Sequence, residues 1–215
     1  MPAVRGMPWH APTGHGTGHL ALGTWTNEFI AISASLIARR AAFVRDLAPI
    51  VEEEYAIVSG QAEQIEIVYQ PDHVDLSAGD VEGQLQRTAE RLAHAEQARQ
   101  LTLFGPQKDD LTFLINGGLV KETASQGQHK SLMVALKLAE ARLLMDRRHE
   151  RPIMLLDDVF SELDAERSAR VLDRILDMGM QCFVTTTDGE RIAAMTRKEV
   201  VVVEVSNGTI HAVAA

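Results

Sequence analysis

The stretch Pro152-Ile153-Met154-Leu155-Leu156-Asp157-Asp158 decides the fold class of this chain. A short apolar run that closes on two adjacent carboxylates indicates a buried strand, and α/β folds place their ligand site at the carboxyl ends of such strands. One carboxylate can coordinate Mg²⁺ while its neighbour orients a water, and phosphoryl transfer requires both roles. The simpler interpretation stays open, because an Asp pair at a strand-to-loop exit can also form a local turn.

Helical and extended patterns alternate on both sides of this stretch. Apolar spacing predicts helices over 125–146, 163–177 and 192–195, and a further strand over 182–185. Hairpins are predicted around Asn116-Gly117-Gly118, with arms 111–115 and 119–121, and around Asn207-Gly208 near the C-terminus. This order predicts an α/β fold with a mostly parallel sheet and flanking helices.

The N-terminal half has a different character. Residues 1–24 are rich in Pro, Gly and His without periodicity, which predicts a flexible tail. Residues 25–103 are expected to form a helical arm: a helix from Trp25 to about Tyr55 that Pro49 kinks or ends, a strand over 65–69 and a helix over 77–100. Residues 104–215 would then form the main lobe.

Composition narrows the function classes. The 215 residues carry a net charge of −9 and 46% hydrophobic residues, which argues for a real core and against a strongly basic nucleic-acid clamp. Local arginine clusters remain, although each is also typical of a solvated helix face; they are Arg39, Arg40 and Arg45, then Arg87 and Arg91, then Arg147, Arg148 and Arg151. The single cysteine, Cys182, is expected to be a buried core residue. No signal peptide or membrane-length apolar run occurs in the sequence, so a cytoplasmic protein without membrane contact is expected.

Two polar segments flank the acid pair. Ser125-Gln126-Gly127-Gln128 opens a predicted helix, whose unpaired N–H groups and positive dipole end suit a phosphate. Taken alone, Ser125 and Gln128 also fit an ordinary capping box. Ser161-Glu162-Leu163-Asp164 can likewise cap the next helix. The fixed order of these segments, followed by Thr185-Thr186-Thr187-Asp188, is far more specific than any one of them.

Together these residues resemble the ABC-type ATPases in their RecF form. Ser-Gln-Gly-Gln resembles the signature motif, Leu155-Leu156-Asp157-Asp158-Val159 the Walker B strand, and Ser161–Asp164 the D-loop. The segment that begins at Gly105-Pro106 is also similar, except that Gln107-Lys108 stands where a His-Arg pair is usual. The chain therefore resembles the C-terminal portion of a RecF recombination and repair protein, a P-loop NTPase with an ABC/SMC-like head.

The resemblance implies a role for each motif residue. Asp157 would hold Mg²⁺, and Asp158 would orient or activate the attacking water. Ser161 and Asp164 would form the D-loop, with Asp164 bridging an ATP-dependent dimer. The residues expected to contact the γ-phosphate of ATP bound to the opposite protomer are Ser125, Gln126, Gly127 and Gln128. Thr187 or Asp188 occupies the position of the switch histidine of many transporters.

At the level of function, the resemblance implies ATP-dependent binding of single-stranded DNA, gapped duplex DNA and single-strand/duplex junctions, with RecO- and RecR-type mediators that load RecA. A Gly-x-x-x-x-Gly-Lys-[Ser/Thr] phosphate loop occurs nowhere in the 215 residues. The chain alone is therefore expected to bind ATP weakly and to hydrolyse none, and its expected partner is a second protomer in an ATP-dependent dimer or an N-terminal half in trans. A fragment, a frame-shifted gene and a split protein each account for this. A nucleotide-independent DNA- or partner-binding module and another SMC-like ATPase head remain alternatives.

Overall fold

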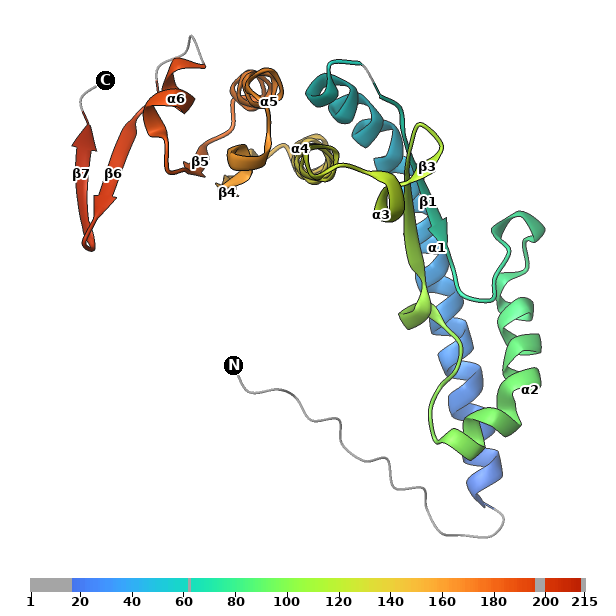
Figure 1. Cartoon of the computed structure of the whole chain (residues 1–215). Helices are drawn as coiled ribbons and strands as arrows, with labels where there is room; N and C mark the ends of the chain where they lie inside the picture. Colours follow the sequence, from blue (N-terminus) through green and yellow to red (C-terminus); the bar gives the residue numbers. More distant parts are fainter. Residues whose placement is uncertain (1–16, 62, 196–199, 214–215) are drawn as a thin grey trace. The chain divides into compact units, whose positions relative to one another are not determined.

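The computed structural model describes residues 17–61, 63–195 and 200–213. These residues form two compact units. The first unit contains the described chain up to Ala41 together with Tyr69–Asp110, and the second contains Ala42–Val68 and Leu111–Ala215. Figure 1 labels the elements of both. The predicted flexible tail falls largely on residues 1–16, which lie outside the described residues, whereas its last part is already helical from Thr17.

Helix α1 (Thr17–Ser59) is longer than the sequence predicted. Of the two effects expected of Pro49, a kink or an end, the end does not occur, because the helix continues through Pro49 to Ser59. A proline inside a helix removes one backbone hydrogen bond, so the following turns must be held by packing. They are, because Val51, Tyr55 and Val58 are fully buried in the second unit.

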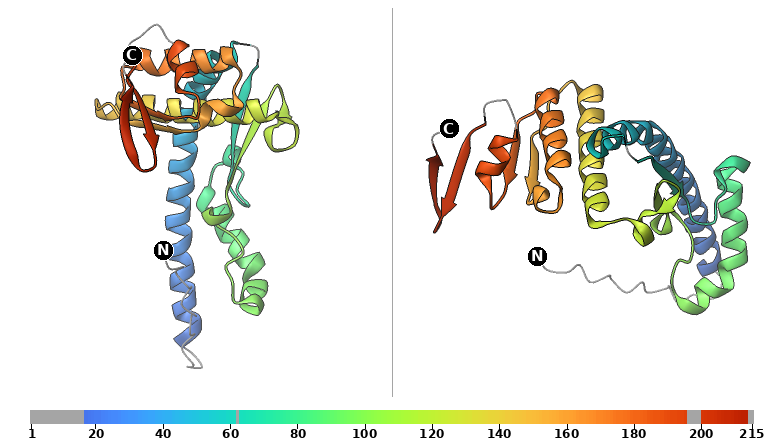
Figure 2. Two further views of the ribbon diagram at one scale, coloured as in Figure 1. Left: turned by 60° about the vertical axis from the view of Figure 1, so that its left-hand side comes forward. Right: turned by 45° about the horizontal axis from the view of Figure 1, so that its top comes forward.

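In the first unit, helix α2 (Val81–Arg99) runs alongside the first half of α1 (Figures 1 and 2). It follows a short 3-10 turn, η1 (Leu76–Ala78), and begins at Asp80, whose carboxylate accepts from the N–H of Gly83. The two helices share a small core; its fully buried or nearly buried members are Ile30, Ile37, Leu85, Ala89 and Phe104.

A buried carboxylate organises the polar side of the first unit. Asp109, only 3% exposed, accepts hydrogen bonds from Arg40 and from the hydroxyl of Tyr69. It follows the 3-10 turn η2 (Pro106–Lys108). The Gln107 and Lys108 side chains, which depart from the family pattern, both donate to nearby backbone carbonyls, at 2.8 and 2.6 Å.

Strands β1 (Ile65–Gln70), β2 (Asp110–Ile115) and β3 (Gly118–Leu119) form one sheet in that order. The β2–β3 turn has φ of 50° at Asn116 and 79° at Gly117, the left-handed pair that the sequence predicted for a tight hairpin. The second arm was expected to reach Lys121. It ends earlier, because the chain turns into helix α3 (Val120–Thr123), where the Thr123 hydroxyl donates to the carbonyl of Leu119.

The second unit holds the elements predicted around the acid pair. Helix α4 (Gln126–Arg148), strand β4 (Met154–Asp157), the 3-10 turn η3 (Val159–Glu162), helix α5 (Ala165–Met178) and strand β5 (Cys182–Thr185) follow one another. Strands β4 and β5 pair in parallel, with Asp157 opposite Thr185. Helix α6 (Gly189–Ala194) and the antiparallel hairpin of β6 (Val202–Ser206) and β7 (Thr209–Val213) complete the described chain.

The predicted α/β class is confirmed, and the parallel part of the sheet is the β4–β5 pair; the other two pairs with a described register, β2–β3 and β6–β7, are antiparallel. Two details differ from expectation. Strand β4 is buried on one face only, and Cys182 is half-buried rather than part of the core. Within the described ranges, none of the helices combines the length and apolarity needed to cross a bilayer.

Candidate functional site

The tip of α4 is closed by the capping box that the sequence predicted. The Ser125 hydroxyl accepts from the N–H of Gln128 at 3.2 Å, and the Gln128 side chain accepts from the N–H of Ser125 at 2.7 Å. The N–H of His129 donates to the Ser125 carbonyl. This pattern leaves the backbone N–H groups of Gln126 and Gly127 for an acceptor outside the helix, at its positive dipole end.

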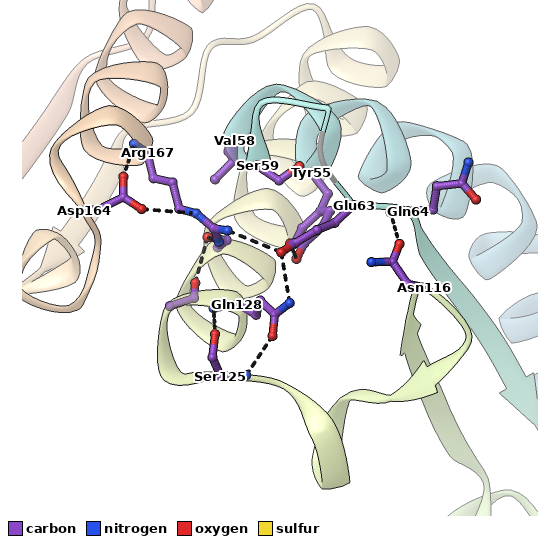
Figure 3. A network of polar contacts seen from close by, with 12 residues as sticks. Tyr55, Val58, Ser59, Glu63, Gln64, Asn116, Ser125, Gln128, Asp164 and Arg167 are labelled. Atoms are coloured by element: carbon purple, nitrogen blue, oxygen red, sulfur yellow. Dashed lines mark hydrogen bonds and ion pairs between the residues drawn. The ribbon is translucent and has the colours of Figure 1, made fainter.

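Gln128 makes a second contact that the sequence did not suggest. Its amide nitrogen donates to Glu63 at 2.9 Å, and Glu63 lies between α1 and β1 (Figure 3). Tyr55 donates to the other oxygen of the same carboxylate at 2.5 Å. Both ends of the Gln128 amide are therefore engaged within the second unit, so the side chain holds the helix tip in place.

Arg167 joins this network from helix α5. Its guanidinium donates to the Ser131 hydroxyl at 2.9 Å and lies 3.4 Å from Glu63 (Figure 3). Burial alone would raise the pKa of Glu63. The hydrogen bonds from Tyr55 and Gln128 and the charge of Arg167 outweigh burial, so the pKa of Glu63 lies below its ordinary value. Glu63 is therefore ionised at neutral pH.

One threonine organises the acid pair at the end of β4. The Thr185 hydroxyl donates to the Asp157 carboxylate at 2.5 Å, and it accepts from the N–H of Asp158 at 3.1 Å. Asp158 has φ of 49°, a left-handed conformation that Asp tolerates better than most residues. This turn redirects the chain after β4, and both acids are exposed.

The D-loop residues lie between the acid pair and the tip of α4. Ser161 donates to the carbonyl of Asp158 at 2.9 Å, and Asp164 caps α5 by accepting from the N–H of Arg167 at 2.7 Å. A Cβ placed on Gly127 would lie 3.7 Å from the carbonyl oxygen of Glu162. The predicted signature glycine and the predicted D-loop are therefore neighbours.

The predicted switch position lies at the start of α6. Asp188 caps this helix, because its carboxylate accepts from the N–H of Arg191 at 3.1 Å, and its own N–H donates to Thr186. Thr187 is exposed beside it. The carboxylate of Asp188 thus has a local structural role.

A groove of about 490 Å³ separates α4 from β4 and η3. Apolar side chains from α4, β4 and η3 line it together with polar residues, most of them from α4; the lining residues are Gln126, His129, Lys130, Met133, Val134, Lys137, Leu155, Leu156, Val159 and Glu162. Lys130 and Glu162 form an ion pair of 3.9 Å at one end of it. The groove therefore begins beside the signature tip.

The metal-binding capacity of the site is limited. Among the residues that the structure describes, no group of three or more His, Cys, Asp or Glu side chains could hold a metal ion. Asp157 with the adjacent Thr185 hydroxyl nevertheless suits Mg²⁺, which binds through one or two carboxylates together with phosphate oxygens and waters. A nucleotide would have to supply the remaining ligands.

The structure brings Gly127 next to Glu162, while the roles expected for Ser125, Gly127, the acid pair and the D-loop stay predictions. Sequence reasoning missed Glu63 and Arg167. Glu63 belongs to no motif, and nothing in its surroundings marks it. Arg167 lies three residues after Asp164, on the first turn of α5, and this spacing is a signal that a helix-face argument can use.

We compared the whole sequence with protein families and with individual known proteins. No family model matches the chain. It is 38% identical over 170 residues to the DNA replication and repair protein RecF of Geotalea daltonii. The matched residues cover 78% of this chain and 47% of that protein. It is 40% identical over 178 residues to the RecF protein of Chloroherpeton thalassium, covering 80% of this chain and 48% of that one. The chain spans about half the length of the curated relatives it matches.

A solved RecF structure is also similar to this chain. The recombination mediator protein RecF with ATPrS, of the RecFOR pathway, superposes with a TM-score of 0.74 at 25% identity and covers 93% of this chain and 52% of that one. The resemblance to RecF that the motifs indicated is therefore confirmed for about half of a RecF chain, as is the P-loop NTPase fold class.

Proposed function

We propose that this chain acts in DNA replication and repair as the signature-bearing half of a RecF-type ATPase head. The observation that carries the proposal is the contact between the α4 tip and the D-loop, where Gly127 lies against the backbone of Glu162. Similarity to RecF proteins over most of this chain supports it. The solved relative is described with bound ATPrS, which makes a nucleotide the natural ligand.

The α4 tip would receive the γ-phosphate of ATP bound to another protomer. The Ser125 hydroxyl and the amides of Gln126 and Gly127 supply donors at a positive helix end, which is a ready anion site. Gln128 would serve the same end by fixing the tip, since both ends of its amide are engaged. An ATP-dependent dimer would then place Asp164 and Ser161 close to both sites.

The acid pair would complete the site. Asp157, oriented by Thr185, would hold Mg²⁺, which would neutralise charge on the phosphates. Asp158 would orient a water through its exposed carboxylate. Thr187 and Asp188 lie at the position from which a switch residue would sense the phosphate. For the DNA partner, we propose single-stranded or gapped duplex DNA, and for protein partners RecO- and RecR-type mediators that load RecA.

Calorimetry tests the nucleotide part of the proposal. The chain alone is expected to show only weak binding of Mg-ATP, because the acids repel the triphosphate and the sequence supplies no phosphate loop. Mixing it with the complementary half of a RecF relative should restore micromolar binding and slow hydrolysis. Micromolar binding by the chain alone would contradict the proposal, as would a mixture that never binds Mg-ATP.

A second candidate function is a nucleotide-independent module that binds DNA or a protein partner. The exposed apolar residues of β4 and β5 favour it, since a bare apolar surface is typical of interaction sites. A double variant with Asp157→Ala and Asp158→Ala, mixed with the complementary half of a RecF relative, separates the two functions in a gel-shift assay on gapped DNA. The ATPase proposal expects loss of ATP-stimulated DNA binding in this variant, and the module expects no change.

A further inference from the structure

One guanidinium in the second unit contacts three different segments of the chain. Arg167 lies on the first turn of α5, and its side chain is only 17% exposed. Its Nε atom lies 3.4 Å from the carboxylate of Asp164. One terminal nitrogen donates to the Ser131 hydroxyl at 2.9 Å, and the other donates to Glu63 at 3.4 Å (Figure 3). Each of the three nitrogens therefore has a partner of its own.

The contact with Ser131 leads to the signature glycine. Ser131 is completely buried in α4, and its hydroxyl donates to the carbonyl of Gly127 at 2.7 Å. The same hydroxyl accepts from Arg167, so both its donor and an acceptor position are used. A hydroxyl held from two sides has little freedom to rotate. The guanidinium is therefore connected to the backbone of Gly127 through one side chain.

The contact with Glu63 leads to the same helix tip. The Oε1 atom that faces Arg167 also accepts from the Gln128 amide at 2.9 Å. Gln128 closes the capping box at the start of α4. Arg167 is thus linked to the tip of α4 (residues 125–128) by two separate chains of hydrogen bonds, one through a hydroxyl and one through a carboxylate.

The third contact fixes the end of the D-loop (residues 161–164). One oxygen of Asp164 accepts from the backbone N–H of Arg167 at 2.7 Å, and the other faces its Nε atom. Asp164 is 63% exposed, so this ion pair adds little to stability by itself. Its effect is geometric, because the backbone and the side chain of one residue both orient the same carboxylate.

Anchoring α5 to α1 does not account for these contacts. Arg170, one turn further along α5, is 31% exposed and donates to the carbonyl of Val58 at 2.9 Å. Its other partner, Glu166, is 88% exposed and lies 3.5 Å away. Arg170 therefore joins the two helices without a printed contact to the α4 tip or the D-loop, whereas Arg167 contacts groups that support both.

We propose that Arg167 is a positioning residue that holds the α4 tip and the D-loop in one fixed arrangement. This inference rests on the proposed function, in which the tip receives the γ-phosphate and Asp164 lies at the dimer interface. Arg167 acts through Ser131, Glu63 and Asp164, and not on the nucleotide itself. The planar guanidinium can serve three partners at once, whereas lysine carries a single charged nitrogen on a flexible stem.

Hydrogen–deuterium exchange of the full 215-residue chain without nucleotide tests the arrangement directly. The variants are Arg167→Met and Arg167→Lys, with Arg170→Met as the matched control. Deuterium uptake over residues 125–130 and 161–166 is expected to rise together in both Arg167 variants and to stay unchanged in the control. Circular dichroism and thermal unfolding establish that each variant is folded. Lysine keeps the charge, so it should recover most of the unfolding temperature that methionine loses, but not the protection of the two segments.

ATP turnover tests the consequence for the proposed reaction. The chain is mixed with the half of the Chloroherpeton thalassium RecF that lies outside the match. Arg167→Lys is expected to lower kcat by at least about tenfold, because a small displacement of positioned groups slows a reaction strongly. The KM for Mg-ATP should change by less than about twofold, since the phosphate loop lies on the other half. Arg170→Met should keep the unsubstituted rate.

The outcomes separate this inference from the proposed function. Unchanged deuterium uptake at either segment in the Arg167 variants would overturn the inference, as would normal turnover by Arg167→Lys. Equal effects of Arg170→Met would reduce Arg167 to a helix anchor and overturn it too. If the unsubstituted mixture never binds Mg-ATP, the proposed function is rejected, and the exchange measurement still decides whether Arg167 holds the two segments together.

Discussion

Glu63 accepts a hydrogen bond from the amide of Gln128 at 2.9 Å, and this contact ties the segment after α1 to the tip of α4 (Figure 3). Gln128 also closes the capping box, so one side chain serves both the helix start and its anchoring. Gln128, which the resemblance assigns to the γ-phosphate, is engaged at both ends of its amide, and its role toward a ligand stays a prediction. Stability and nucleotide recognition are therefore expected to be linked at this point.

The Glu63 contact predicts a pH-dependent stability difference. The pKa of Glu63 is lowered on folding, so its contribution is present above the unfolded carboxyl pKa of about 4.3 and is lost as the pH falls through the lower folded value. Glu63→Gln is expected to cost about 1 to 2 kcal/mol at pH 7 and almost nothing at the acid end. Urea unfolding across pH 3 to 7 measures this, with the exposed Glu66→Gln as control. A cost that does not change with pH would contradict the assignment.

Ser125 combines a structural and a proposed binding role, and two substitutions separate them. Ser125→Ala removes the N-cap and is expected to cost about 1 kcal/mol of unfolding free energy. Ser125→Asp keeps a capping oxygen, so stability should be retained, but its charge would repel a phosphate. ATP-dependent dimerisation of the assembled halves is expected to fail in both variants. Normal dimerisation of the Asp variant would remove Ser125 from the phosphate site.

Glu54 is completely buried in α1, and Arg174 of α5 pairs with both of its oxygens, at 2.7 and 2.6 Å. The hydrogen bond to this carboxylate raises the pKa of Arg174 despite burial. Glu54→Ala leaves the Arg174 guanidinium, which is 24% exposed, without its carboxylate partner and is expected to cost about 2 to 3 kcal/mol. The neighbouring Glu53 is 60% exposed, so Glu53→Ala should cost less than about 1 kcal/mol. Thermal unfolding of the two variants is the comparison, and equal losses would contradict it.

Asp158 has a backbone conformation and a side chain that can be tested independently. Asn tolerates its φ of 49°, so Asp158→Asn should change stability by less than about 0.5 kcal/mol. The β-branched Asp158→Val should cost about 1 to 2 kcal/mol. Both variants are expected to abolish ATP turnover in the assembled halves if the carboxylate handles the water. Turnover by the Asn variant at the normal rate would assign Asp158 a purely structural role.

The sequence predicted an element well where interactions between residues close in the chain decide its structure. The capping box at Ser125 and the turn at Asn116-Gly117 follow from side-chain chemistry within a few residues, and the parallel strands around Asp157 from the alternation of strands and helices. The sequence left open whether Pro49 kinks or ends α1, because the packing of Tyr55 and Val58 against distant elements decides where the helix ends. Apolarity alone also gave no sign that β4 would be buried on one face only.

The candidate site also has a part that the sequence predicted and a part that it did not. Motif order was enough to single out the signature tip, the acids and the D-loop as candidate site residues. The support beneath them was not predictable, since Glu63 reaches Gln128 across 65 positions and Arg167 reaches Glu63 across 104. Contacts between residues so far apart leave no periodicity in a single sequence.

The pairing of Glu54 with Arg174 also bears on how the protein is made. The arginine is synthesised 120 positions after the glutamate, which at roughly 5–20 residues per second means a delay of roughly 6 to 24 s on the ribosome. Throughout that interval the apolar second half of α1 must wait for the helices that will cover it. The first unit, by contrast, can close as soon as residue 110 has emerged. Nascent chains are thus expected to pass through an intermediate in which the first unit is folded and the second half of α1 is still exposed, and chaperones are expected to bind this intermediate.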